Sequence, residues 1–198
     1  MPRMRSEDRR RQLLEVSAEL FARGGYRGTT TAELAKAASV TEPILYRHFD
    51  NKLDLFITLV DEVGKEVLDA WKEALDGVND PHERLMALLA SNPATHEKGQ
   101  TAYRVIFQAM TEIGRDPEIA KPLRRHLNKL HIFIREEIIN LQKTGAVRTD
   151  EPAPMLAWML MNVAIGYGMT MPLGIPGQSG SVNKKAMQKM LYELMRVN

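Results

Sequence analysis

Residues 29–56 read TTTAELAKAASVTEPILYRHFDNKLDLF, and this stretch predicts two short helices joined by a tight turn. Thr30 is a suitable N-cap residue, and Glu33 stands three positions later. This spacing is the capping-box pattern, in which each of the two side chains binds the backbone N–H of the other residue. The pattern predicts a short helix over residues 31–38, followed by a turn at Ser39.

The second short helix is expected over residues 42–49, because Thr41 is a plausible N-cap and Pro43 falls in the first turn. Leu45 and Phe49 lie four residues apart, so they share one face and can pack against a core. The other faces then carry a mixture of aromatic, cationic and polar side chains. Packing against the core does not explain why so short a helix carries these side chains on its exterior.

A longer helix is predicted over residues 6–24, where apolar residues recur at helical spacing until Gly24-Gly25 stops it. A long helix followed by two short ones is a helix-turn-helix unit. In that motif the last helix enters the major groove of DNA. The aromatic and cationic exterior of residues 42–49 therefore predicts a DNA-binding surface.

Each polar group of this surface has a plausible partner on DNA. Tyr46 and His48 can hydrogen-bond phosphate oxygens, while Arg47 and Lys52 can neutralise phosphate charge. Pro43 and Ile44 suit apolar contact with a thymine methyl group, and Thr41 and Glu42 can reach base edges. Thr30 and Thr31 place hydroxyls at a helix N-terminus, which binds phosphate.

The remaining sequence predicts further helices and no convincing strand, so the chain is expected to be all-α with about nine helices. A domain boundary is expected near Asp50-Asn51, which separates a DNA-binding domain over 1–51 from a larger helical domain over 52–198. The expected helices of the second domain are Lys52–Leu75, 81–91, 99–114, 117–144, 153–171 and 183–197.

Charge is distributed unevenly along the 198 residues. The whole chain has a net charge of only +2, but residues 1–52 hold ten Lys and Arg against seven Asp and Glu. This local excess favours a polyanionic partner. The chain contains no cysteine, which excludes disulfides, thiol catalysis and cysteine-based zinc sites. The charged N-terminus lacks an apolar signal core, so we expect a cytoplasmic protein.

The quoted stretch and its lead-in resemble the DNA-binding signature of the TetR (tetracycline-repressor-like) family of bacterial transcriptional regulators. The matching elements are F-A-x-x-G-Y-x-x-T-T at Phe21–Thr30, A-x-x-A at Ala35–Ala38, and Leu45-Tyr46-x-His48-Phe49 followed by Asn51-Lys52. The resemblance implies a three-helix DNA-binding domain and a helical C-terminal domain for ligand binding and dimerisation. It also implies binding of double-stranded operator DNA as a homodimer, with Tyr46 and Lys52 touching phosphate.

Two positions depart from the family pattern. The turn usually has glycine where this chain has Ser39, so the backbone there is expected to be strained or differently twisted. Ala32 has no long side chain with which to read a base. Readout is therefore expected to depend on the second short helix and on Arg3 and Arg5, which can reach a minor groove as a flexible arm.

A small-molecule effector is the other expected partner, since the family implies a ligand pocket in the C-terminal domain. Large side chains on long amphipathic helices suit a largely apolar ligand, with Gln108, His131 or Asn162 as orienting groups. Such aromatic residues at helical spacing are also common in ordinary cores. The predicted ligand-binding residues are Trp71, Tyr103, Phe107, Met110, His131, Trp158, Met161, Asn162 and Ile165, with Phe133 as further lining material.

Residues 152–183 carry no charged side chain, and part of this run is long enough to span a bilayer. Asn162, Thr170 and several glycines dilute it, so a helix covered by protein is the preferred interpretation and no membrane contact is expected. Ala157, Ala164 and Gly168 form a stripe of small residues that allows close helix packing. With Leu191, Leu194 and Met195 of the last helix, this stripe is the predicted dimer interface.

Other functions find less support in the sequence. No Gly-rich phosphate loop, H-E-x-x-H or G-x-S-x-G motif is present, so no enzyme activity and no cofactor are predicted. No metal site is predicted either, because His126 and His131 are five residues apart and do not share a helix face. The main alternative is a helical partner-binding module without sequence-specific DNA binding. That alternative does not explain why basic and aromatic residues gather on one short helix.

Overall fold

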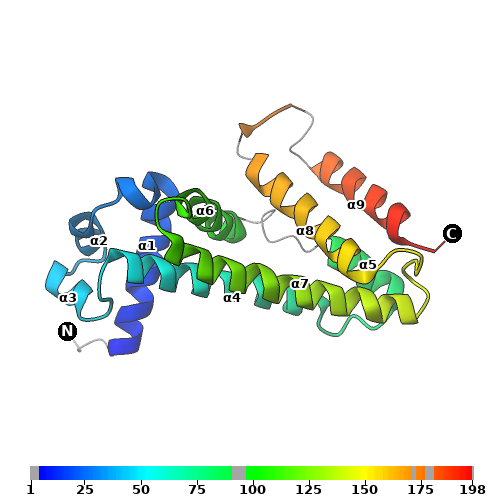
Figure 1. The fold of residues 1–198 in the computed structure, drawn as a ribbon, viewed down its shortest axis with the longest axis horizontal. Helices are drawn as coiled ribbons and strands as arrows, with labels where there is room; N and C mark the ends of the chain where they lie inside the picture. Colours follow the sequence, from blue (N-terminus) through cyan, green and yellow to red (C-terminus); the bar gives the residue numbers. More distant parts are fainter. Residues whose placement is uncertain (1–4, 91–96, 171–172, 177–180, 198) are drawn as a thin grey trace. The chain divides into compact units, whose positions relative to one another are not determined.

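The computed structural model describes residues 5–90, 97–170, 173–176 and 181–197, and in these residues the chain is helical without any β-strand. The all-α prediction with nine α-helices is therefore confirmed for the part of the chain that is described. The elements, shown in Figure 1, are α1 Ser6–Gly28, α2 Thr31–Ala37, α3 Glu42–Tyr46, α4 Lys52–Leu75, α5 Pro81–Ala90, α6 Glu97–Glu112, a 3₁₀ turn η2 at Pro117–Ile119, α7 Ala120–Lys143, α8 Ala153–Thr170 and α9 Ser181–Met195.

Several expected helix ends differ from the observed ones, and two of these differences lie in the helix-turn-helix. α1 continues to Gly28 instead of stopping at Gly24-Gly25, but Gly25 has non-helical dihedrals (φ 70°, ψ 166°) and divides the helix by a kink. Glycine adopts a positive φ without steric cost, so the expected stop is present as a bend. α3 ends at Tyr46 rather than near residue 49, and the chain continues as a turn through His48.

The chain divides into two compact units. The first contains the described residues of 1–65 and 101–126, and the second those of 66–100 and 127–197. α4 and α7 each contribute residues to both units. The predicted boundary near residue 51 coincides with the start of α4, whereas the units divide α4 after Lys65.

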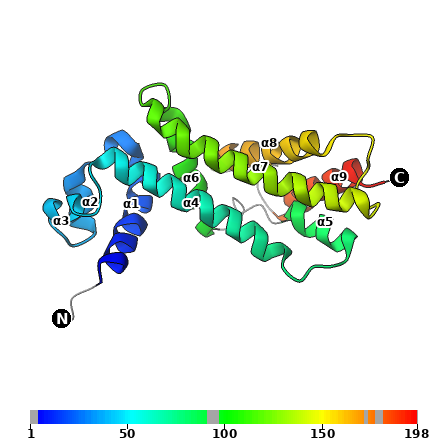
Figure 2. The same ribbon diagram turned by 60° about the horizontal axis from the view of Figure 1, so that its bottom comes forward.

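An aromatic cluster forms the centre of the first unit. The Phe21 ring meets Phe56 edge-on, with 5.1 Å between centroids, and Tyr26 lies 4.7 Å from Phe56. Phe21 and Phe56 are fully buried. Because these residues come from α1 and the start of α4, the cluster fixes the two helices that flank α2 and α3. Figure 2 shows α1, α2 and α3 side by side in this unit.

The same unit contains a close approach of α4 to α7. A Cβ atom at Gly64 would lie 2.8 Å from Nδ1 of His126, so any side chain at this position would force the two helices apart. Asp61 lies one helical turn before Gly64 on α4, and it accepts two hydrogen bonds from Arg125 of α7, at 3.0 and 2.7 Å. Burial lowers the pKa of His126, which favours the neutral form of the packed ring.

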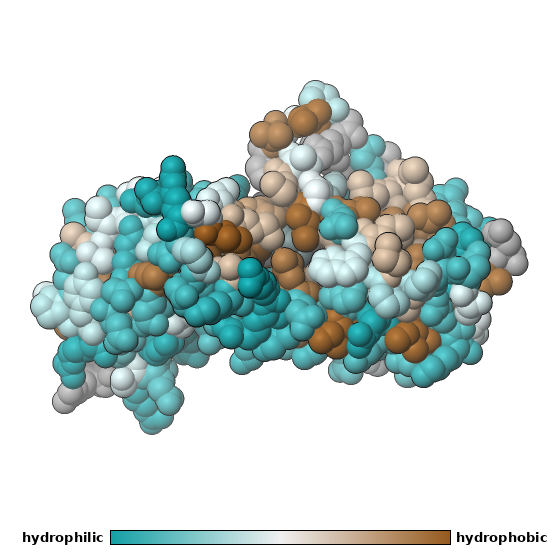
Figure 3. All heavy atoms as spheres, viewed as in Figure 1, coloured by the Kyte–Doolittle hydropathy of each residue, from teal (hydrophilic) through white to brown (hydrophobic). Residues whose placement is uncertain are grey.

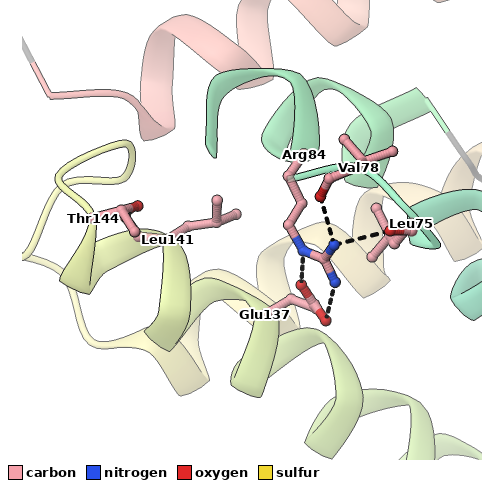
Figure 4. Close-up of polar contacts among 6 residues, drawn as sticks. All are labelled: Leu75, Val78, Arg84, Glu137, Leu141 and Thr144. Carbon is pink, nitrogen blue, oxygen red and sulfur yellow. Dashed lines mark hydrogen bonds and ion pairs between the residues drawn. The ribbon is translucent and has the colours of Figure 1, made fainter. Parts of the chain in front are cut away.

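In the second unit an arginine caps the end of α4 (Figure 4). The last carbonyls of a helix lack intrahelical partners. Arg84 of α5 donates from Nη1 to the carbonyl oxygens of Leu75 and Val78, at 2.9 and 2.8 Å. Its Nε and Nη2 form a two-pronged ion pair with Glu137 of α7. This one side chain thus joins α4, α5 and α7, while α9 lies beside α5 (Figures 1 and 2).

Candidate nucleic-acid interface

The capping box at the start of α2 is present as predicted. Glu33 N–H donates to Oγ1 of Thr30 at 3.2 Å, and Thr30 N–H donates to Oε2 of Glu33 at 2.7 Å. The hydrogen bonds that the Glu33 carboxylate accepts from the Thr30 N–H and the Thr30 hydroxyl lower the pKa of this carboxyl. The box therefore holds the Thr30 side chain at the exposed N-terminus of α2 and fixes where α2 begins.

Ser39 makes the turn between α2 and α3 with a left-handed backbone (φ 55°), and it is the only described residue other than glycine with a positive φ. The expectation of strain at this position is confirmed, because non-glycine residues rarely adopt this conformation. Backbone bonds compensate: Ser39 N–H donates to Lys36 O at 3.0 Å and Val40 N–H to Ala35 O at 2.9 Å. The turn therefore keeps its geometry without glycine.

α3 and the turn that follows it are held by two buried apolar residues, since Leu45 and Phe49 are 1% and 2% exposed. A side-chain bond adds to this anchor: the Thr31 hydroxyl of α2 donates to Oε2 of Glu42 at 2.8 Å. Thr41 occupies the N-cap position of α3 but makes no side-chain capping bond. The Glu42 carboxylate thus has a structural partner, whereas Thr41 presents an exposed side chain beside it.

The outward side chains of α3 and the following turn are those that the sequence nominated. Tyr46 is 45% exposed, Arg47 and Pro43 are exposed, and Ile44 and His48 are half-buried. The surface over α1, α2 and α3 is mainly hydrophilic in Figure 3. The structure therefore brings these residues to one end of the first unit, where a phosphate backbone and base edges can meet them.

α1 adds positive charge beside α3. The Arg10 guanidinium lies 4.7 Å from the centroid of the Phe49 ring. Burial, followed by the charges of Arg47, Arg10 and Arg9, lowers the pKa of His48. Arg9 and Arg10 are thus part of the electropositive surface, whereas Arg11 pairs with acidic residues of its own helix. Only the fold reveals this, because Phe49 is distant in sequence.

Lys52 begins α4 with its Nζ 4.5 Å from the centroid of the Tyr26 ring. Burial lowers the pKa of this ammonium group, and the nearby Glu112 opposes that shift. Glu112, a buried carboxylate at the end of α6, also accepts a hydrogen bond from Arg27 Nε at 3.1 Å. The half-buried Lys52 is thereby held in place at the edge of the surface around α3.

The predicted ligand-binding residues belong to both units. Tyr103, Phe107 and Met110 lie on α6 in the first unit, and burial raises the pKa of Tyr103 to about 12. The others lie in the second unit, where Met161 is buried but Trp158 and Asn162 are exposed. Ile165 and Phe133 are half-buried. His131 stacks on Trp158 with 4.6 Å between ring centroids and contacts the Pro154 carbonyl through Nε2 at 3.1 Å.

The second unit contains a cavity of about 50 Å³, and Trp71 is the predicted ligand residue that lines it. The rest of the wall comes from α5, α8 and α9 and was not nominated from the sequence, because it depends on which helices pack together. Its other lining residues are Leu88, Leu89, Leu160, Val163, Ala164, Tyr167, Lys184, Met187, Gln188 and Leu191.

The small-residue stripe of α8 faces inward rather than outward. Ala157 and Gly168 are buried within the chain, as is Met195 of α9, and Ala164 lines the cavity. The expected interface of small residues is therefore corrected. The exposed side of α8 carries larger apolar residues, and α9 has two more; Figure 3 shows apolar side chains gathering in this region. These exposed residues are Met155, Trp158, Met169, Met190 and Leu194.

Among the described residues there is no group of three or more His, Asp or Glu side chains placed to hold a metal ion. None of the described helices combines the length and the apolar character that crossing a bilayer requires.

Comparisons with known proteins extend this description. A family model described as bacterial regulatory proteins, tetR family, matches residues 13–59. The HTH-type transcriptional activator FasR of Mycolicibacterium smegmatis is 29% identical over 122 residues, which cover 62% of this chain and 55% of that protein. The HTH-type transcriptional regulator UidR of Escherichia coli is 22% identical over 158 residues, covering 79% of this chain and 78% of that one.

Solved structures share the fold of this chain over nearly its whole length. A putative transcriptional regulator from Saccharomonospora viridis, in complex with choline, superposes with a TM-score of 0.83 at 25% identity and covers 96% of each chain. A putative TetR-family regulator from a Rhodococcus species has the same fold, with a TM-score of 0.81 at 17% identity over 96% of this chain and 100% of that one. The helix-turn-helix of this chain thus matches that of the tetR family of bacterial regulatory proteins, and the fold of the chain is the one seen in TetR-family regulators.

Proposed function

We propose that this regulator is a repressor that binds operator DNA as a homodimer and is released by a small, largely apolar ligand. The surface around α3 carries the first part of the proposal. Exposed Tyr46 and Arg47, half-buried His48 and the neighbouring Arg9 and Arg10 combine hydrogen-bond donors with positive charge. Such groups hold a phosphate backbone, while α3 itself is of the size that enters a major groove.

The two domains follow from the same assignment. We propose that residues 1–51 form the DNA-binding domain and residues 52–198 the ligand-binding and dimerisation domain. α4 starts at Lys52, beside the proposed DNA surface, and ends at Leu75, shortly after cavity-lining Trp71. A single helix therefore contains a residue of each proposed site. A ligand that favours one position of this helix would change the DNA-binding equilibrium through its differential affinity.

Homodimerisation is supported by the exposed apolar side of α8 and α9. Met155, Met169 and Met190 are more than half exposed, and Leu194 is 50% exposed. An apolar surface of this kind is typical of an interaction site. A two-fold axis lets the same surface serve both subunits, and a dimer matches DNA half-sites one helical turn apart.

Binding of the protein's own upstream DNA tests the central claim. We expect fluorescence anisotropy to show specific binding that weakens steeply as salt rises, because each phosphate contact releases counterions. Replacing Lys52 with alanine should lower the slope of log K against log salt by about one. The matched control is Lys65→Ala on the exposed side of the same helix, which should leave the slope unchanged. Binding that does not respond to salt would contradict the proposal.

A promoter-fusion assay separates repression from activation. We expect deletion of the gene to raise expression from the bound promoter and a ligand to mimic that deletion. FasR is named as an activator, so a fall in expression on deletion would reassign this protein to that role. The DNA-binding assignment would stand in either case.

A further inference from the structure

The last turns of α6 pack against the end of α1, which leads directly into α2 (Figure 1). A Cβ atom at Gly25, in the kink of α1, would lie 3.2 Å from Oε1 of Gln108, so the two helices approach closely here. One turn further along α6, Glu112 accepts the hydrogen bond from Arg27 Nε at 3.1 Å. Both contacts lie inside the first unit. The end of α6 therefore sets an acidic group against a cation at the end of α1.

The two partners of this ion pair differ in their exposure. The Glu112 side chain is 10% exposed, whereas the Arg27 side chain is 60% exposed. A buried carboxylate has lost its hydration and needs a cation or hydrogen-bond donors in its place. The Glu112 carboxylate is thus confined by packing and holds a guanidinium group that stands largely in solvent. A guanidinium paired in this way has little net charge left to offer a phosphate.

Arg27 lies where a phosphate contact is expected. It precedes by three residues Thr30, which stands at the exposed N-terminus of α2. Lys52, the expected phosphate contact at the start of α4, lies over the ring of Tyr26, the neighbour of Arg27. Burial lowers the pKa of Lys52, and the charges of Glu112 and then Arg27 act on it next, so these groups lie close together. Without its acid, Arg27 would be a second cation beside Lys52 that can bind a phosphate oxygen.

We propose that Glu112 restrains sequence-independent DNA binding by neutralising and holding the Arg27 guanidinium. Glu112 is a positioning residue in this role, because it acts on DNA through Arg27 and does not touch DNA itself. The inference rests on the proposed DNA-binding surface around α3 and adds a residue of α6 that limits its strength. Such restraint has a use, because a genome offers a large excess of non-specific sites that compete with the operator for the protein.

An isosteric substitution tests this restraint. Glu112→Gln keeps the size of the side chain and an oxygen that accepts from Arg27 Nε, but the bond is then no longer charge-assisted and is weaker. By fluorescence anisotropy, we expect the variant to bind a duplex of random sequence roughly fivefold more tightly than the parent. The slope of log K against log salt should be steeper by about one, as one further phosphate contact requires. A loss of packing alone would weaken binding, so a gain distinguishes this role from a structural one.

Two double variants identify the cation that is released. Glu112→Gln combined with Arg27→Gln should return the affinity and the slope to the parent values. Glu112→Gln combined with Arg23→Gln has the same net charge and should keep the gain, because Arg23 is an exposed residue of α1 that pairs with Glu19. Urea denaturation of each variant checks that it is folded. The proposal is overturned if Glu112→Gln binds like the parent or more weakly, or if its gain survives the loss of Arg27.

The parent protein separates this inference from the proposed function. If the parent shows no salt-dependent binding to any duplex, the proposed DNA-binding surface fails and the role of Glu112 fails with it. If the parent binds as expected and Glu112→Gln changes neither affinity nor slope, only the role of Glu112 fails. Tyr46, Arg47 and Lys52 then remain as the proposed phosphate contacts.

Discussion

The surfaces of α3 and α8 differ in how they are held and in what they offer a partner. α3 is five residues long and is held by buried Leu45 and the Thr31–Glu42 bond. The outward groups of α3 and of the turn after it include Tyr46 and the cationic Arg47. α8 is eighteen residues long and has no charged side chain, and its outward groups include Met155 and Trp158. The surface around α3 suits a hydrated polyanion. Burial of the apolar surface of α8 away from water would lower the free energy.

The largest expected effect concerns the anchor of α3. Leu45→Ala removes a side chain that is 1% exposed, and it should lower the free energy of unfolding by about 2–5 kcal/mol. The matched control is Leu173→Ala, because Leu173 is 69% exposed and its loss should change the stability by no more than about 0.5 kcal/mol. Urea denaturation measures both values. Equal effects would mean that α3 is not held by its apolar face.

The next effect concerns the outer side of α9. Met190 is 72% exposed, so Met190→Glu should fold normally but place a carboxylate in the proposed dimer interface. Sedimentation at micromolar concentration should then show a monomer. Lys189→Glu places the same side chain one residue earlier on the exposed surface and serves as the control. A Met190→Glu protein that sediments as the parent dimer does would remove this surface from the interface.

The sequence predicted the surface of α3 better than that of α8, because the features of α3 depend on residues that are close together in the sequence. The capping box of Thr30, the strained turn at Ser39 and the burial of Leu45 depend on residues a few positions apart. For α8, the spacing of Ala157 and Gly168 correctly placed these residues on one face of the helix. It did not tell whether that face packs inside the chain or lies on the exposed surface. Both helix faces are uncharged, so charge gives no direction.

Binding sites assembled from distant segments were the least predictable. The cavity wall combines α4, α5, α8 and α9, and of the nine ligand-binding residues predicted from the sequence only Trp71 belongs to it. Aromatic residues at helical spacing indicate a buried face but do not reveal a void. Arg10 was likewise missed as a neighbour of Phe49, because that proximity arises from packing between helices.

A smaller effect distinguishes two threonines of the proposed DNA-binding surface. Thr31→Val keeps the side-chain shape but removes the hydroxyl that donates to Glu42, so it should cost about 0.5–1.5 kcal/mol of stability. Thr41→Val is the matched substitution at an exposed site without a capping bond, and it should cost less. Thermal unfolding of both variants measures the difference. A larger loss for the Thr41 variant would show that its hydroxyl has a structural role.

The smallest effect is a pH dependence at His48. Burial and the charges of Arg47, Arg10 and Arg9 lower its pKa below the usual 6.5 in the free protein. The unfolded chain therefore takes up a proton first as the pH falls below about 6.5, so this group makes acidification destabilising until its folded pKa is passed.

DNA should reverse the sign of this effect for binding, because a phosphate near His48 stabilises the charged imidazolium and raises its pKa. The complex then binds a proton that the free protein lacks, so affinity should rise by roughly two- to fivefold between pH 7.5 and 6.0 at constant ionic strength. His48→Gln should abolish this rise, whereas His82→Gln, a change at an exposed histidine of the second unit, should retain it. Anisotropy titrations at the two pH values give the ratio directly. An unchanged pH dependence in the His48 variant would place that side chain away from the phosphates and leave Tyr46 and Arg47 to hold the backbone.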